Sequence, residues 1–354
     1  MAFLSRATNS QPLSLNNDLH ADVHPSDSIS EMAFSPCADI LAVASWDNIV
    51  RMYEVDGTGK AVKRAEYSHQ APALGTCWMR DGSKVVSGGC DNAVRAYDLQ
   101  SGQMMQIGAH DQPVQKVRGI IAGGTPVIAS CSWDKTLKYW DLRQQTPIAT
   151  VQLPERAYNM SSEKNLLVVT TAERSVVVID LSAPQNIFQT RTSTLKLQTR
   201  ALSCNKEGTG FSYGSIEGRC AIAYAAPKEQ EEKGFAFKCH RVPRGGTPSE
   251  GDDVYAVNST CFHPKHGTLA TAGSDGTLKF WDIESKSRLR GTNPVGGAIV
   301  SIDFNAAGTL LAYGVSYDWS KGHNGNTPGY PNRVTVHVVN EMVVKKKGAA
   351  RVNR

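Results

Sequence analysis

The clearest structural signal in the chain is the segment ASCSWDKTLKYWDL, residues 129–142. Apolar and polar residues alternate on either side of a short polar turn, which is the pattern of two β-strands joined by a hairpin. Asp134 suits this turn because its carboxylate accepts hydrogen bonds from nearby backbone N–H groups. A side-chain network of His110, Ser130, Asp134 and Trp140 would satisfy the carboxylate and the indole N–H when both are buried. We therefore predict a hairpin held by a structural hydrogen-bond network.

The same unit recurs along almost the whole chain. One acidic residue stands at the turn of each copy: Asp47, Asp91, Asp134, Glu173, Glu217, Asp275 and Asp318. Successive copies are separated by 44, 43, 39, 44, 58 and 43 residues. A period of about 40–45 residues with Trp-Asp-type endings is typical of WD repeats, each of which forms one four-stranded blade. The sequence therefore predicts an all-β fold, a seven-bladed WD-repeat β-propeller in a single closed domain.

Members of the expected network recur at the same period. The second and sixth repeats supply His69, Ser87, Asp91 and Tyr97, and Thr271, Asp275 and Trp281. His, Ser and Asp also make up catalytic triads, but an active site is not copied at the period of a structural repeat. The chain has no nucleophile elbow and no phosphate-binding loop. We assign these residues a structural role and expect a protein that is not an enzyme and has no cofactor.

Cysteine usage and hydropathy indicate the compartment. The eight cysteines are scattered without a C-x-x-C pair, so we expect free buried thiols in a reducing environment. Cys261, His263 and His266 lie near Cys239 and His240, but they lack zinc-type spacing, and we expect no metal site. The sequence shows neither a signal peptide nor a long apolar run, which predicts an intracellular protein without a membrane partner.

We expect three parts in the chain: a flexible arm over residues 1–17, the propeller over 18–343 and a basic tail over 344–354. A propeller must not leave an open sheet edge between its first and last blades. The segment Asp18–His24 should therefore pair into the blade that contains Arg333–Val339.

The tail carries five basic residues and no acidic ones: Lys345, Lys346, Lys347, Arg351 and Arg354. Their charge equals the net charge of +5 of the whole chain. Such a tail suits nucleic acid or another acidic partner, and lysine-rich runs also serve as nuclear-import signals; a merely solvated tail is the alternative.

Two insertions interrupt the repeats. Residues 226–253 account for the long spacing; their acidic beginning and Gly/Pro-rich end should be loops, and Phe235–Arg241 should be an outer strand. In the last repeat, residues 317–331 replace the usual turn and, being too polar for burial, should lie on one face of the disc. Arg219 follows an exposed turn, where either a binding residue or a solvated arginine fits.

Several segments resemble the Rae/Gle family of nuclear-pore-associated messenger-RNA export factors, and the related Bub-type spindle-checkpoint propellers share much of the pattern. They are SWDNIVRMYEV at 45–55, FKCHR at 237–241, VYAVNSTCFHPKHGTLATAGSDG at 254–276 and SYDWSKGH at 316–323. The arm and the basic tail are more similar to the export factors than to the checkpoint proteins.

The resemblance implies a binding face and a partner. Both groups bind a short acidic segment, the GLEBS motif, which an FG-nucleoporin carries in the export branch and a kinase in the checkpoint branch. Paired glutamates of that segment are held by basic residues, which match Arg219, Lys238 and Arg241 here, and Trp46 resembles an aromatic contact. The family also contacts RNA, and we expect weak, sequence-independent binding of single-stranded RNA or messenger ribonucleoprotein through the tail. The implied location is the nucleus and the nuclear pore complex, with shuttling to the cytoplasm. A checkpoint scaffold and a ubiquitin-ligase substrate adaptor are the alternatives.

Overall fold

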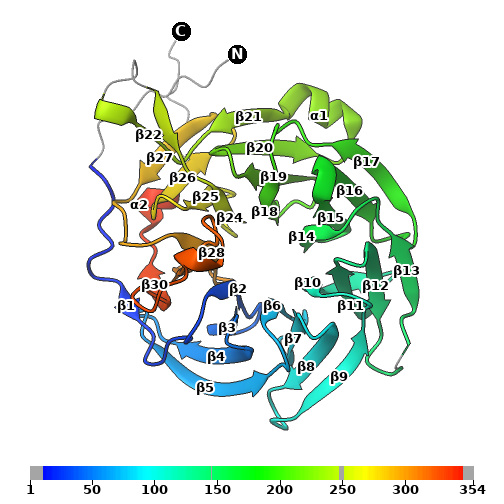
Figure 1. Cartoon of the computed structure of the whole chain (residues 1–354). Coiled ribbons are helices and arrows are strands. Elements are labelled where there is room, and N and C mark those ends of the chain that lie inside the picture. The colour runs from blue at the N-terminus through cyan, green and yellow to red at the C-terminus, as the bar shows by residue number, and fades with distance from the viewer. Residues whose placement is uncertain (1–10, 145, 247–250, 346–354) are drawn as a thin grey trace.

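A computed structural model describes residues 11–144, 146–246 and 251–345. These residues form seven four-stranded antiparallel sheets arranged around a ring, together with one two-stranded sheet (Figure 1). The structure therefore confirms the predicted seven-bladed β-propeller.

Six blades take their strands from consecutive segments. Blades one to three contain β2 (Ile29–Phe34), β3 (Ile40–Ser45), β4 (Ile49–Val55) and β5 (Ala61–Ser68); β6 (Ala73–Trp78), β7 (Lys84–Gly89), β8 (Ala93–Asp98) and β9 (Met104–Ala109); and β10 (Val114–Ala122), β11 (Thr125–Ser132), β12 (Thr136–Trp140) and β13 (Ala149–Gln152). Blades four to six contain β14 (Ala157–Glu163), β15 (Leu166–Thr171), β16 (Ser175–Asp180) and β17 (Ile187–Thr192); β18 (Thr199–Cys204), β19 (Gly210–Ser215), β20 (Arg219–Tyr224) and β21 (Phe235–Lys238); and β24 (Val257–Phe262), β25 (Leu269–Gly273), β26 (Leu278–Asp282) and β27 (Ser287–Gly291).

Blade seven closes the ring with strands from both ends of the chain. It contains β28 (Ile299–Phe304), β29 (Leu310–Val315), β30 (Arg333–Val338) and, as its outer strand, β1 (Leu19–His20). In the register, Leu19 lies opposite Val336 and His20 opposite Thr335 (Figure 1). The predicted pairing of the two chain ends is confirmed, and it leaves no open sheet edge at the joint.

The long insertion differs from the prediction at both ends. Its acidic beginning forms the helix α1 (Pro227–Lys233) rather than a loop, because proline suits the first helical turn and Glu229 pairs with Lys233 one turn on, at 2.8 Å. The outer strand β21 ends at Lys238 rather than at Arg241. The Gly/Pro-rich end, expected to be a loop, contains a short antiparallel strand pair, β22 (Arg241–Pro243) with β23 (Asp252–Val254). The remaining elements are η1 (Ala172–Arg174), η2 (Arg244–Gly246), η4 (His323–Gly325) and α2 (Glu341–Val344).

Both terminal segments pack on blades six and seven. Leu13 forms a parallel bridge with Thr292, and Leu13 and Leu15 pack against the core that these two blades share. Val344 is fully buried in the same core. Residues 1–10 of the expected arm and residues 346–354 of the expected tail lie outside the described part of the chain.

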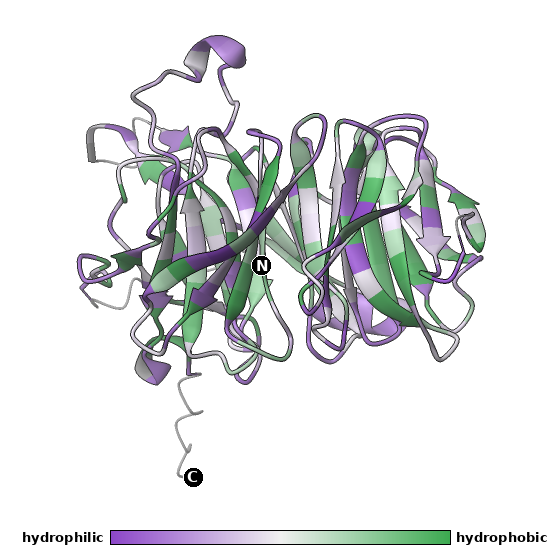
Figure 2. Ribbon diagram, turned by 90° about the horizontal axis from the view of Figure 1, so that it is seen from below, coloured by the Kyte–Doolittle hydropathy of each residue, from purple (hydrophilic) through white to green (hydrophobic). Residues whose placement is uncertain are grey.

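Hydrophobic burial between neighbouring blades holds the ring together. The second strands are almost continuously apolar and buried, as in β15 and β29, and the core clusters extend from one blade to the next. Figure 2 shows the hydrophobic residues along the strands and the hydrophilic ones mainly in the loops. Among the described residues, no helix combines the length and the apolar character needed to cross a bilayer.

Candidate partner-binding face

The repeated turn lies at the same place in every blade, between the second and third strands. Because all blades share one strand order, these seven turns lie on one face of the ring, which we call the turn face. The residue after the acidic position always has a positive φ: Asn48, Asn92, Lys135, Arg174, Gly218, Gly276 and Trp319. Asn and Gly tolerate this left-handed backbone conformation, whereas a large aromatic residue there is a true outlier.

The predicted networks connect each turn to the strands of its blade. In blade three, the carboxylate of Asp134 can only accept, so His110 donates from Nδ1 to Oδ2 of Asp134 at 2.9 Å. Nε2 of His110 accepts from the hydroxyl of Ser130 at 2.7 Å, and Oγ of Ser130 accepts from the indole N–H of Trp140 at 2.7 Å. All four side chains expected in this network are thus connected.

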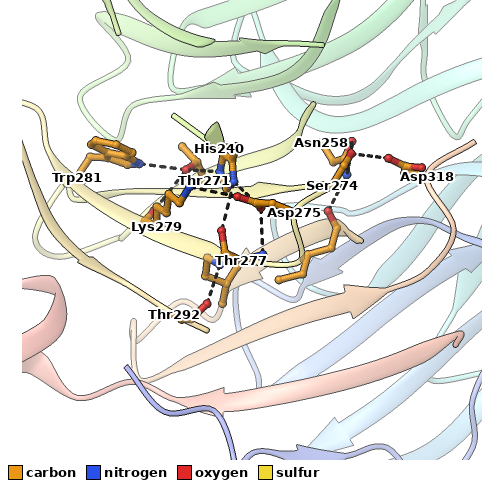
Figure 3. Close-up of polar contacts among 12 residues, drawn as sticks. His240, Asn258, Thr271, Ser274, Asp275, Thr277, Lys279, Trp281, Thr292 and Asp318 are labelled. Atoms are coloured by element: carbon orange, nitrogen blue, oxygen red, sulfur yellow. Dashed lines mark hydrogen bonds and ion pairs between the residues drawn. The ribbon is translucent and has the colours of Figure 1, made fainter. Parts of the chain in front are cut away.

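Blade six repeats the arrangement with His240 as the ring that the sequence analysis had not included (Figure 3). His240 lies 2.8 Å from Asp275 through Nδ1 and 2.9 Å from Thr271 through Nε2, and Trp281 donates to Thr271 at 3.0 Å. Burial lowers the pKa of His240 and outweighs the neighbouring carboxylate. Burial alone would raise the pKa of Asp275. The hydrogen bond and charge of His240 and the charge of Lys279 outweigh burial and hold this pKa well below its usual range.

In blade two, the expected network forms, but its aromatic member is Tyr67 and not Tyr97. His69 lies 2.9 Å from Asp91 and 2.7 Å from the hydroxyl of Ser87. The hydroxyl that donates to Ser87 belongs to Tyr67, at 2.7 Å, whereas the ring of Tyr97 stacks on Tyr67 with centroids 5.2 Å apart. The aromatic member therefore comes from the outer strand of blade one.

The residues weighed as zinc ligands have other contacts. Nε2 of His263 donates to the carbonyl oxygen of Gly308 at 2.9 Å. His240 belongs to the blade-six network. In the described part of the chain, no group of three or more His, Cys, Asp or Glu side chains has a metal-binding arrangement.

A cavity of about 1040 Å³ occupies the centre of the ring and is lined by the first strand of every blade. At its turn-face end, the lining side chains are large and largely apolar: Trp46, Trp133, Ile216, Val254, Tyr255 and Trp319. Ile216 and Val254 are 38% and 44% exposed. An apolar rim around a polar channel is a surface suited to a partner.

Trp46 and Trp319 form the centre of this rim. Their rings lie 4.7 Å apart between centroids and are tilted by 34°. Trp319 occupies the left-handed turn position with φ of 61°, and its Nε1 is buried with no hydrogen-bond partner among the described residues. Strained residues with unpaired polar atoms are concentrated at functional sites.

The segment that carries Trp319 is more buried than expected. Tyr317 and Asp318 are each only 4% exposed, because Asp318 accepts a hydrogen bond from Ser274 and its carbonyl accepts one from Arg200 at 2.5 Å. Asn258 donates to Ser274 at 3.2 Å and so extends this contact within blade six (Figure 3). Polar partners from blades five and six therefore fix the position of the segment on the turn face.

The predicted basic residues meet at one corner of blade five. Arg219 and Lys238 lie opposite each other in the register of β20 and β21. Arg241 donates to the carbonyl oxygens of Glu217 and Gly218, at 2.7 and 3.3 Å. Three cationic side chains thus surround one turn beside the apolar rim.

These three residues differ in their exposure and in the contacts that they already make. The side chain of Arg219 is 37% exposed and lies 3.8 Å from Glu217, and Lys238 is exposed. Arg241 is held more firmly, with two carbonyl acceptors and Asp252 at 3.8 Å. Arg241 therefore supports the turn, whereas Arg219 and Lys238 are open to a carboxylate.

The expected RNA-binding residues lie mostly beyond the described chain. Lys345 is exposed at the end of α2, and Lys346, Lys347, Arg351 and Arg354 are outside the described residues.

The sequence analysis missed the aromatic residues that accompany Trp46. Trp133 occupies the same turn of blade three and donates from its indole N–H to Gln115 at 3.0 Å. A tryptophan beside the acidic turn residue, as in Trp133-Asp134 and Asp318-Trp319, was the available signal.

The ring of seven blades defines a WD-repeat β-propeller. The sequence model of the family "WD domain, G-beta repeat" matches residues 19–54, 102–141 and 248–282. The chain is 49% identical to the "Poly(A)+ RNA export protein" of Schizosaccharomyces pombe, over 98% of this chain and 100% of that protein. It is 47% identical to "mRNA export factor GLE2" of Chaetomium thermophilum, over 96% of each, and 42% identical to "Protein Rae1" of Drosophila melanogaster, over 88% and 91%. The chain belongs to the Rae/Gle family of messenger-RNA export factors.

Proposed function

We propose that this protein is a non-enzymatic scaffold of the nuclear pore that supports messenger-RNA export. Its turn face binds an acidic GLEBS-type segment of an FG-nucleoporin, and the protein resides in the nucleus and at the nuclear pore complex and shuttles to the cytoplasm. The relatives that are named as RNA or mRNA export factors support the proposed role in messenger-RNA export.

One observation carries the binding proposal: Arg219, Lys238 and Arg241 gather around the Glu217-Gly218 turn, directly beside an apolar rim. An arginine fork forms charge-assisted, often bidentate hydrogen bonds with a carboxylate. The neighbouring rim offers Trp46 and the other apolar side chains to the rest of the segment. An acidic segment with apolar residues fits both parts.

The test is the binding of a fluorescent peptide that contains the acidic segment of an FG-nucleoporin. Arg219→Glu and Lys238→Glu should each weaken binding by at least about 2 kcal/mol, because the introduced glutamate would repel the carboxylates of the acidic segment. Arg64→Glu is the matched control, since Arg64 is an exposed arginine on the outer strand of blade one. Equal affinities for all four proteins would exclude this site.

Affinity capture from nuclear extract then identifies the partner. Wild type should retain FG-nucleoporins, and Arg219→Glu should lose them. Retention of checkpoint kinases or ubiquitin-ligase subunits instead would favour the two alternative functions and would leave the binding face intact.

RNA binding is the second part of the proposal. The tail that begins at Lys345 attracts single-stranded RNA weakly and without sequence preference, because its contacts are to phosphates.

A further inference from the structure

The outer strand of blade four exposes a large aromatic side chain. Phe188 lies at a bulge of β17: Val178 pairs with Gln189 and Ile179 with Ile187, so Phe188 has no opposite residue. The equivalent bulge contains Leu289 in blade six, which is 7% exposed, and the charged Arg64 in blade one. Phe188 is 58% exposed.

Phe188 lines a pocket between blades four and five. The pocket has a volume of about 280 Å³, and its walls include Leu166, Ile179 and Ala225 besides Phe188. Its size suits one or two apolar side chains rather than a whole small molecule. Ile187, next to Phe188, is 37% exposed and extends the apolar surface.

This pocket lies on the face opposite the turn face. Its lining includes Asn165 and Thr209, which belong to the turns between the first and second strands of their blades. Those turns lie at the other end of the strands from the Glu217 turn. An occupant here would not compete for the turn face.

Carboxylates gather on one side of the pocket. Asp180 and Glu229 line it, and Glu231 and Glu232 are exposed on α1, which lies at the outer rim beside β17 and β20 (Figure 1). Of the two lysines of α1, Lys233 is already paired with Glu229 at 2.8 Å. The α1 side therefore carries an excess of negative charge beside an apolar pocket.

We propose that this pocket is a second docking site, which binds a protein segment that has a large apolar side chain next to lysine or arginine. The apolar side chain enters beside Phe188, and the basic residue faces Asp180 and the acidic residues of α1. Because the two docking sites lie on opposite faces, the scaffold can hold two partners at once.

A phage-displayed library of random peptides, selected on the full-length protein, tests this proposal. Peptides that wild type enriches, and that the Phe188→Glu variant does not, should share an aromatic or large aliphatic residue next to Lys or Arg. A consensus peptide should lose at least about tenfold in affinity with Phe188→Glu and with Ala225→Trp, which fills the pocket. Asp180→Lys should weaken binding and its dependence on salt.

Two controls separate this site from others. Met105→Glu alters another exposed apolar residue, on the outer strand of blade two, at 49% exposure, and should leave binding unchanged. Arg219→Glu on the turn face should also leave the affinity for the consensus peptide unchanged. The experiment can therefore refute the proposal for this pocket independently of the proposal for the acidic segment. The absence of any peptide that distinguishes wild type from Phe188→Glu, or a consensus that is acidic, would overturn the proposal.

Discussion

The carboxylate of Asp303 in blade seven accepts a hydrogen bond from the backbone N–H of Phe34 in blade one, with 2.8 Å between Oδ2 and the nitrogen. Sγ of Cys261 in blade six lies 3.3 Å from Oδ1 of Asp303. The carboxyl group of Asp303 therefore links its own blade to both neighbouring blades, six and one, at the joint where the ring closes. Burial raises the pKa of Asp303 to about 6, although the N–H of Phe34 acts in the opposite direction.

This carboxyl group should make stability depend on pH. The pKa of Asp303 in the folded protein, about 6, lies above its ordinary value of 3.8, so the folded state holds the proton more tightly than the unfolded chain. Its contribution to stability is complete below the ordinary pKa and is lost as the pH rises through the folded pKa. Asp303→Asn, which stays neutral, should be more stable than wild type at about pH 8 by up to about 3 kcal/mol, and by about half as much at about pH 5.

Urea unfolding of both proteins at the two pH values measures this difference. Asp111→Asn, at an exposed carboxylate, is the control and should show no such change. A stability difference between Asp303→Asn and wild type that stays the same at both pH values would contradict the assignment.

The network of blade three should be important for stability. Ser130→Ala removes the acceptor of the Trp140 indole N–H and the donor to His110, and leaves both polar groups buried. The expected loss in the free energy of unfolding is about 2–4 kcal/mol. Thr170→Val is a matched control, because Thr170 is fully buried but its hydroxyl has no partner among the described residues; it should be neutral or stabilising. Equal losses for both variants would show that the network adds nothing beyond packing.

Closure by the N-terminal strand gives a further prediction. Removal of residues 1–20 exposes the edge of β30 and deletes Asp18, which accepts from Tyr313 at 2.9 Å and lies 2.7 Å from His337. The melting temperature should fall clearly. Removal of residues 1–10 alone leaves every described contact and should change stability by less than about 0.5 kcal/mol. Similar melting temperatures for the two truncations would mean that β1 does not hold the ring closed.

The period of the repeat made the fold predictable, because the turn residues and alternating strands recur even where single copies are degenerate. The closure followed from the need to cover a sheet edge, and the blade-three network from the partners that a buried Asp and Trp require. The apolar rim was not predictable in this way, since Trp46, Trp133 and Trp319 are distant in the chain and line one end of the same cavity only through the curvature of the ring. The helix α1 was missed because acidic residues after a proline fit both a loop and a first helical turn.

We expect Trp319 to contribute more to partner binding than to stability, because its backbone is strained. A left-handed conformation costs a non-glycine residue about 1–2 kcal/mol, which is similar to what the ring contact of Trp319 with Trp46 contributes. Trp319→Asn should therefore keep the stability within about 1 kcal/mol of wild type, since Asn tolerates this conformation at the equivalent turn positions 48 and 92. Binding of the acidic segment should still fall by at least about tenfold. Thermal unfolding and fluorescence polarisation measure the two effects, and unchanged affinity would remove Trp319 from the binding face.

The basic tail should determine how RNA binding responds to salt. If Lys345, Lys346, Lys347, Arg351 and Arg354 all engage phosphates of single-stranded RNA, the logarithm of the association constant should fall with the logarithm of salt concentration with a slope of about −3.5, from about −0.7 per contact. Removal of residues 345–354 should flatten this slope toward zero, because five counterions are no longer released. Titrations of a fluorescent single-stranded RNA at several salt concentrations measure the slope. Lys228→Glu, a change of an exposed lysine on α1, is the control that should leave it unaltered. A slope that survives removal of the tail would place the RNA contacts on the propeller itself.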